Sequence, residues 1–203
     1  MTVLDLDRDG YTRLPPGRLA LAVTYLEQRE PPAPRPDPAI PGLALVALGA
    51  ADLDRYLALF SAVGEPWLWF GRRVMPRAEL AAILADPRVE AFALIRDGAD
   101  IGILELDGRG DGEIELAYFG LVPEAVGGGL GRWLMNRAME RAWAGRPARV
   151  FVHTCSLDHP GALDFYRRSG FVPYARALEI ATDPRLTGVL PKTAAPQVPL
   201  IEG

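Results

Sequence analysis

The sequence predicts a mixed α/β fold of the α+β type, in which one sheet is flanked by helices. Three strand-like segments joined by tight turns occupy the middle of the chain, and a glycine-rich turn then leads into alternating helices and strands. The 203 residues are enough to bury one core, so we expect a single domain over residues 1–203. A hydrophobic fraction of 49% with 24% charged residues is ordinary for a soluble globular protein.

Composition and charge limit the kinds of partner. A net charge of −4 argues against a nucleic-acid groove and is compatible with a basic or amine substrate. No apolar run approaches the ~20 residues of a membrane span, and the acidic start, broken at Gly10, does not resemble a signal peptide. The single Cys155 excludes an internal disulfide and a Cys-rich zinc site. We therefore expect a cytoplasmic protein with no metal ion and with no nucleic-acid or membrane partner.

Local signals divide the first 85 residues into strands, loops and helices. The proline-dense segment 30–42 cannot form a helix or a central strand, so it is expected to be a surface loop. Asp52 is a candidate cap for the helix that follows it. In order, we expect a lead-in at 1–18, a strand at Leu19–Gln28, the loop at 30–42, and helices at Leu53–Val63 and Arg77–Ala85.

The middle of the chain contains three strands in succession. Val89–Arg96 and Asp100–Leu106 are joined at Asp97-Gly98, a dipeptide typical of two-residue hairpin turns. A third strand begins at Glu113, after a turn at 107–112, and ends at Pro123. Alternation predicts that one face of this strand holds Glu113, Glu115 and Ala117, and that the other holds Ile114, Leu116 and Tyr118.

The last third begins with the glycine-rich turn and an amphipathic helix. This helix is expected to bury Leu130, Leu134, Ala138 and Met139. The remaining elements are a strand at Arg149–Thr154, a helix from Pro160 to Arg168 that Gly170 ends, a strand at Phe171–Ile180, and a proline-rich extension over 182–203 along the surface.

The glycine turn is a candidate anion site. Its glycines, Gly127, Gly128, Gly129 and Gly131, let the backbone approach a ligand, and a helix N-terminus behind such a turn suits phosphate. The turn is not a P-loop, because Arg132-Trp133 follows Gly131 instead of Lys-Ser/Thr. It is also a poor dinucleotide fingerprint, because Arg132 stands where the third glycine belongs. A protein that binds ATP at this turn is the most remote class considered.

A second segment, later in the chain, makes the interpretation of the glycine turn more specific. The turn reads Val126-Gly127-Gly128-Gly129-Leu130-Gly131, and the later segment carries Ala162, Tyr166, Gly170 and Phe171 at a helix-to-strand junction. Together they resemble the GNAT superfamily of acyl-CoA-dependent N-acyltransferases, over about Leu43 to Ile180. Either motif alone is weak, whereas both in register are specific. The resemblance implies a mostly antiparallel central sheet with splayed central strands.

The resemblance also implies a cofactor site for acetyl-CoA. Backbone N–H groups of the turn would hold the pyrophosphate, and the pantetheine arm would lie beside the preceding strand like an extra strand. Val126 replaces the usual Gln or Arg of the turn, and Arg132 either compensates for it or is a solvated residue. His159 stands where many members have a cofactor-binding Asn. The implied cofactor residues are Phe119, Leu121, Val122, Gly127, Gly128, Gly129, Leu130, Gly131, Arg132 and His159.

The implied reaction is direct transfer of acetyl to an amine of an unidentified small molecule or protein. An amine must lose a proton before it attacks a thioester, and Glu115 stands where members of the family keep the base, with Glu113 in reserve and His159 as an alternative. Tyr166 stands where the family protonates the leaving thiolate. His153 is expected to be structural, and Asp158 is either a helix cap or a catalytic group. No ligand spacing supports a metal site of His153, His159 and Asp158.

Several alternatives stay open at this point. A non-catalytic acyl-CoA sensor or partner-binding module on the same fold competes with the enzyme, and a homodimer is left open. The aromatic group Trp67-Leu68-Trp69-Phe70 either packs in the core, which is the commoner role, or lines the acceptor pocket. The identity of the acceptor does not follow from the sequence.

Overall fold

The computed structural model describes residues 9–202 and contains one seven-stranded mixed sheet. Its strand order is β2-β3-β4-β5-β6-β1-β7, and only β5 and β6 run parallel. The expected fold class is confirmed, although residues 1–8 of the lead-in lie outside the described residues. The strands are β1 (Arg18–Gln28), β2 (Leu43–Leu48), β3 (Val89–Arg96), β4 (Ala99–Asp107), β5 (Glu113–Leu121), β6 (Arg149–Cys155) and β7 (Val172–Thr182).

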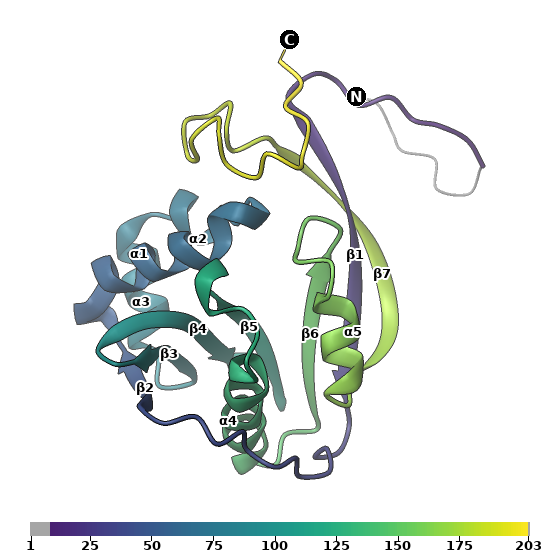
Figure 1. Ribbon diagram of the computed structural model, residues 1–203. Helices are drawn as coiled ribbons and strands as arrows, with labels where there is room; N and C mark the ends of the chain where they lie inside the picture. Colours follow the sequence, from purple (N-terminus) through teal and green to yellow (C-terminus); the bar gives the residue numbers. More distant parts are fainter. Residues whose placement is uncertain (1–8, 203) are drawn as a thin grey trace.

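Helices cover both faces of the sheet (Figure 1). On one face α1 (Leu53–Gly64), α2 (Gly71–Val74) and α3 (Arg77–Ala85) lie against the half made of β2 to β5. On the other face α4 (Leu130–Ala144) and α5 (Ala162–Arg168) enclose the larger core. Three short 3₁₀ helices complete the fold: η1 (Ala50–Asp52), η2 (Glu65–Trp67) and η3 (Pro123–Ala125).

The two central strands separate soon after they meet. β5 and β6 pair only where Glu113, Ile114 and Glu115 face Arg149, Val150 and Phe151. Beyond these pairs the sheet divides into one half of β2 to β5 and another of β6, β1 and β7, and Figure 1 shows the opening between them. The predicted splay of the central strands is therefore confirmed.

A β-bulge in β5 changes which side chains face each layer. Glu105 pairs with Tyr118, while the next residue of β4, Leu106, pairs with Leu116, so that Ala117 has no partner on β4. An extra residue reverses the alternation beyond it. Leu116 consequently packs in the core under α4, and Tyr118 packs on the opposite face with α1. The prediction that Tyr118 shares a face with Leu116 is wrong for this reason.

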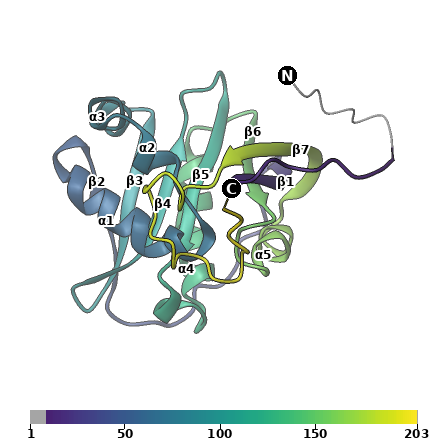
Figure 2. The ribbon, with the colours of Figure 1, turned by 90° about the horizontal axis from the view of Figure 1, so that it is seen from above.

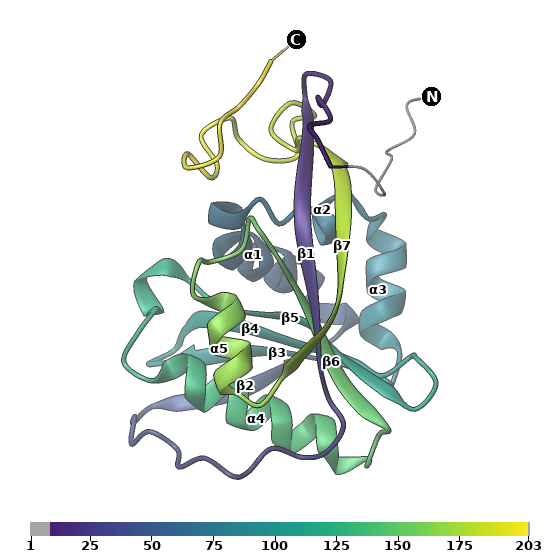
Figure 3. The same cartoon turned by 90° about the vertical axis from the view of Figure 1, so that its right-hand side faces the viewer.

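The N-terminal strand completes the second half-sheet. β1 lies between β6 and β7 and is antiparallel to both, so these two strands are not neighbours although they follow one another in the chain. β1 and β7 form a long ribbon that rises above the rest of the sheet (Figure 3). From β1 the proline-rich loop 30–42 crosses to the opposite edge of the sheet along α4, where Asn136 donates hydrogen bonds to the Arg35 carbonyl and the Asp37 carboxylate.

Two helix ends differ in their details from the sequence prediction. Asp52 precedes α1, but its carboxylate accepts a hydrogen bond from the Gly49 N–H, at 3.0 Å, and does not cap α1. α5 begins at Ala162, two residues later than predicted, because Pro160 and Gly161 form the turn that leads into it. Its C-terminal end is as expected, with Gly170 at φ +96°.

The C-terminal extension is more than a surface tail. Arg185 is only 3% exposed and its guanidinium binds the Asp183 carboxylate at 2.7 Å. The same guanidinium donates to the carbonyl oxygens of Ala194, Ala195 and Val198, which folds the segment around it. The segment spans the opening between the two half-sheets (Figures 1 and 2). The predicted extension along the surface therefore also has a small core of its own, and near its end the Ile201 carbonyl accepts a hydrogen bond from the Gly17 N–H at 3.0 Å.

A buried charged group anchors α2 to the sheet. Glu105 on β4 is 0% exposed, and its carboxylate accepts hydrogen bonds from the Arg72 guanidinium and the Tyr56 hydroxyl. The Arg72 guanidinium also lies 5.1 Å from the centre of the Tyr118 ring. An ion pair out of water costs desolvation, and the loss of one partner leaves the other charge buried alone.

We expect Arg72→Met to lower the free energy of unfolding by about 3–5 kcal/mol, because it leaves the Glu105 carboxylate buried without a cation. The control is Arg73→Met at the exposed neighbouring position, which should change the free energy by less than about 0.5 kcal/mol. Urea denaturation measures both. Equal losses for the two variants would contradict a stabilising role for the buried pair.

Candidate active site

The glycine turn is shaped to bind an anion. Gly127, Gly128 and Gly129 have φ values of +109°, +58° and +86°, a region that glycine adopts without strain. These residues turn the chain from η3 into α4. Among the described residues, no acceptor is found for the backbone N–H groups of the three glycines, of Gly131 or of Arg132. Five free donors at the N-terminus of a 15-residue helix suit a negatively charged group.

The surroundings of the turn are close-packed on one side. A methyl group at Gly129 would lie 3.0 Å from Cγ of Pro38 in the proline-rich loop. A methyl group at Gly131 would lie 3.5 Å from the ring of Phe165 on α5. Val126 is exposed and offers no polar contact, while Arg132 is exposed and forms no ion pair within residues 9–202. Glycine is thus required at Gly129 for space as well as for conformation.

The edge of β5 beyond its bulge borders the opening. From Leu116 to Leu121 the strand pairs with β4 on one side, and β6 offers no partner on the other. Phe119 faces α5, where its ring lies 5.6 Å from that of Phe165 and 6.3 Å from that of Tyr166. The strand edge and the glycine turn follow one another in the chain, separated only by η3, so the predicted cofactor residues of the two segments lie in consecutive elements. Leu130 is the exception among them as a surface residue, because it is buried.

Glu115 lies where the two central strands part, and His153 faces it. The Nδ1 atom of His153 is 3.1 Å from Oε1 of Glu115, and the two side chains are 48% and 28% exposed. This hydrogen bond is the main cause that raises the pKa of His153 above its usual range. The sequence prediction of a purely structural His153 missed this contact, because it depends on the register between β5 and β6.

Glu113, the reserve base, is engaged by a cation. Arg149 approaches both of its carboxylate oxygens, at 2.8 and 2.9 Å, and also binds Glu27 at 3.1 Å. Glu113 and Glu115 border a hollow of about 290 Å³, whose other lining residues are Asp107, Arg109, Gly110 and Phe151. Its Asp107 carboxylate is in turn paired with Arg109 at 2.6 Å.

Tyr166 lies on the other side of the opening. Its ring packs against those of Phe119, Phe165 and Phe171, and burial raises the pKa of its hydroxyl. The hydroxyl forms no hydrogen bond with any residue from 9 to 202. A phenol that stays protonated and has no protein partner can donate a proton to a bound group.

His159 and Asp158 join the two sides of the opening. Nδ1 of His159 accepts a hydrogen bond from the Gly161 N–H at 3.0 Å, and its ring lies 5.2 Å from that of Trp67. Asp158 accepts hydrogen bonds from Trp69 Nε1 at 3.0 Å and from Thr154 Oγ1 at 2.7 Å. Asp158 is therefore a bridge between β6 and the segment after η2, and the residue before α5 in the capping position is Gly161.

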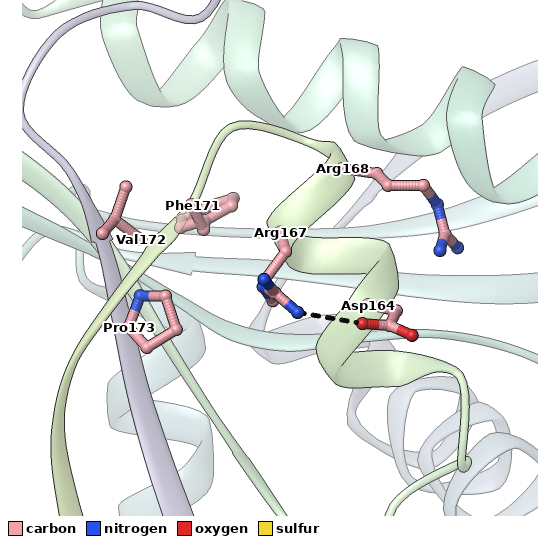
Figure 4. Close-up of a pocket in the computed structure, with 6 residues that line it drawn as sticks. All are labelled: Asp164, Arg167, Arg168, Phe171, Val172 and Pro173. Atoms are coloured by element: carbon pink, nitrogen blue, oxygen red, sulfur yellow. Dashed lines mark hydrogen bonds and ion pairs between the residues drawn. The ribbon is translucent and has the colours of Figure 1, made fainter.

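The aromatic group after α1 has a divided role. Trp69 packs in the core, with its ring 5.6 Å from Phe60 and 5.4 Å from Tyr118. Trp67 instead contacts His159 across the opening. A wider hollow of about 520 Å³ lies beside the C-terminal end of α5, lined by Asp164, Arg167, Arg168, Phe171, Val172 and Pro173 (Figure 4). It contains none of the predicted site residues.

In the part of the chain that the structure describes, no three side chains of His, Cys, Asp or Glu come together in a way that could hold a metal ion. Nor is any helix of that part long and apolar enough to cross a membrane.

The family of the chain follows from its sequence and this geometry together. The sequence model of the acetyltransferase (GNAT) family matches residues 56–171, a stretch that contains the glycine turn, Glu115 and Tyr166. The chain belongs to the GNAT acetyltransferase family. The resemblance drawn from the two motifs is thereby confirmed. No curated protein sequence matches the chain.

Solved structures of GNAT proteins share the fold. A GCN5-related N-acetyltransferase from Kribbella flavida has a TM-score of 0.55 at 19% identity, over 85% of this chain and 63% of its own. A putative GNAT acetyltransferase from Novosphingobium aromaticivorans has a TM-score of 0.55 at 21% identity, over 82% of this chain and 67% of its own. Spermidine N-acetyltransferase from Vibrio cholerae has a TM-score of 0.51 at 19% identity, over 71% of this chain and 95% of its own. This GNAT chain thus spans just under two thirds of the length of the Kribbella protein.

We expect Gly129→Ala to weaken CoA binding by about tenfold or more, because the methyl group meets Pro38 and the φ of +86° is strained for alanine. The matched control is Gly128→Ala, where φ is +58° and nothing lies within 4 Å of the added methyl group. Its effect should be smaller. Isothermal titration calorimetry with CoA measures both, and equal affinities for the two variants would show that the turn does not need its close packing.

Proposed function

We propose that this protein transfers an acetyl group from acetyl-CoA directly to an amine. The observation that carries the proposal is the unpaired edge of β5, which runs from the Glu115–His153 pair at one end to the glycine turn with its free donors at the other. Membership of an acetyltransferase family supports it. The amine could belong to a small molecule or to a protein, and the cytoplasmic location and the homodimer remain predictions.

Acetyl-CoA fits this surface in one orientation. The pyrophosphate would accept hydrogen bonds from the five free N–H groups of the turn, with the dipole of α4 and the Arg132 guanidinium adding attraction. The amides of the pantetheine arm would bond the free edge of β5 beside Phe119, Leu121 and Val122, as an added strand does. The thioester would then lie near the bulge at Ala117, between Glu115 and Tyr166.

Glu115 and His153 together provide the base. Nδ1–H of a neutral His153 donates to Glu115, which leaves the Nε2 lone pair to accept a proton from the ammonium group. Glu115 holds the ring and stabilises the imidazolium that forms. Glu113 is bound by Arg149, and His159 uses its Nδ1 lone pair to accept from Gly161, so neither offers an equally free acceptor.

The remaining steps follow from the chemistry of a thioester. The deprotonated amine nitrogen attacks the acetyl carbonyl carbon, and the tetrahedral intermediate then breaks the carbon–sulfur bond. The leaving CoA thiolate takes its proton from the Tyr166 hydroxyl, which burial keeps protonated. The nitrogen gives up its second proton as the amide forms, and this proton converts the Tyr166 phenolate back to the phenol. The products are therefore an N-acetylated amine and CoA, with the first proton held by His153.

Turnover with acetyl-CoA and a panel of amines tests the proposal, with free CoA thiol as the readout. We expect Glu115→Gln to lower kcat by about 10²–10⁴-fold, and Tyr166→Phe to lower it by at least about tenfold, with CoA affinity unchanged. The control is Glu140→Gln on the exposed face of α4, which should leave kcat unchanged. CoA binding without transfer to any amine would instead indicate an acyl-CoA sensor, and stabilisation by ATP but not by CoA would contradict both.

The pH profile of kcat tests the pairing of Glu115 with His153. Because the base is neutral His153, kcat should rise with pH through the pKa of this residue, which its hydrogen bond to Glu115 raises. Glu115→Gln removes the main cause of that shift. The acidic limb of the kcat–pH profile should therefore move to lower pH in the variant, and the plateau value of kcat should fall. An acidic limb at the same pH in both proteins would exclude His153 as the titrating group.

A further inference from the structure

The inner face of the second half-sheet points a row of side chains toward the opening. Cross-strand partners share a face, and Tyr25 pairs with His153, Val23 with Cys155, and Leu21 with Glu179. Residues two apart on a strand also share a face, so Glu179 projects from the same side as His153. This side faces away from α5, because Leu26 and Val152 of the opposite face pack in the core below that helix.

Glu179 is the carboxylate on this face that lacks a partner. Glu113 and Glu27 are bound by Arg149, and Glu115 is bound to His153. Glu179 is exposed and forms no hydrogen bond or ion pair with any residue between 9 and 202. An exposed carboxylate of this kind is free to bind a cation that enters the opening.

The negative charge of Glu179 affects the pKa values of groups on both sides of the opening. The pKa of His153 is raised first by its hydrogen bond to Glu115, and those of Cys155 and Tyr118 are raised first by burial, but the charge of Glu179 adds to all three. His153 and Cys155 belong to β6, whereas Tyr118 belongs to β5. These effects agree with the strand register, which places Glu179 on the same face as His153, although it belongs to the edge strand β7.

An aromatic surface lies beside the path from Glu115 to Glu179. The Tyr25 ring is 5.7 Å from that of His153 and 6.1 Å from that of Tyr174. Aromatic faces attract cations and pack against methylene chains. The Arg149 guanidinium lies 5.3 Å from the Tyr174 ring, at the other end of this row, and would repel a second cation there. A cationic chain is thus directed toward Glu179 and away from Arg149.

We propose that the acceptor is a diamine or polyamine, and that Glu179 binds its second ammonium group while the first reacts beside Glu115 and His153. This inference rests on the proposed function and names the substrate class of the same site. β6 and β7 are separated by β1, and the partner of Glu179 on β1, Leu21, lies four residues from the partner of His153, Tyr25. The backbones of Glu179 and His153 are therefore roughly 10 Å apart across the sheet and roughly 13 Å apart along it. The two side chains bridge part of this separation, and the rest suits a long diamine or a polyamine, which a monoamine cannot replace.

Steady-state kinetics with matched amines tests the role of Glu179. The acceptors are n-butylamine and n-hexylamine against 1,4-diaminobutane, 1,6-diaminohexane and spermidine. In the native protein, kcat/KM should be at least about tenfold higher for 1,6-diaminohexane and for spermidine than for the monoamines, and 1,4-diaminobutane, which is shorter, should gain less. Glu179→Gln should remove this preference through KM, with kcat and the KM for acetyl-CoA unchanged. Glu140→Gln, which removes the same charge from the exposed face of α4, should preserve it.

Ionic strength gives a second readout. Salt screens exposed charges, so the KM for 1,6-diaminohexane should rise with salt in the native protein and much less in Glu179→Gln. Equal preference for monoamines and diamines in the native protein, or a diamine preference that survives Glu179→Gln, would overturn the role of Glu179 alone. The absence of transfer to every amine, with Glu115→Gln indistinguishable from the native protein, would overturn the proposed function as well.

Discussion

The short parallel contact between β5 and β6 is the constraint on which the candidate site depends. Three residue pairs join the half-sheets, and beyond Glu115 the facing edges of the two strands have no strand partner. Backbone N–H and C=O groups need hydrogen bonds, so this opening suits either water or an extended amide chain. The glycine turn continues directly from the free edge of β5, and Glu115 is the last paired residue before the gap. The strand edge that would bind acyl-CoA and the side chains that would react with it therefore both lie where the hydrogen bonding between β5 and β6 stops.

The far end of the opening is held by contacts that do not belong to the sheet. Trp69 donates to Asp158 across it, and Trp67 contacts His159. The C-terminal segment adds a small apolar core in which its own residues meet Leu68 on one side and Leu157 on the other. Because contacts tie the half-sheets at both ends, we expect the separation of β5 and β6 to be similar with and without ligand, and a preformed site loses less entropy on binding.

Local signals in the sequence predict most helices and strands, whereas the pairing and register of the strands cannot be predicted from such signals. The hairpin at Asp97-Gly98 and the glycine turn are determined by a few adjacent residues, so their chemistry can be read from the chain. The reversed face of Tyr118 depends on a bulge opposite β4, and the pairing of His153 with Glu115 depends on the register of β6. The place of β1 between β6 and β7, and with it the direction of Glu179, depends on pairing over more than a hundred residues.

The central claim is that acyl-CoA occupies the opening between β5 and β6, and amide hydrogen exchange with and without CoA tests it most directly. We expect slower exchange on CoA binding at the N–H groups of residues 127–129, 131 and 132 and along residues 119–121, with no change in the β3–β4 hairpin. Protection confined to other parts of the chain, with these two segments unchanged, would contradict it.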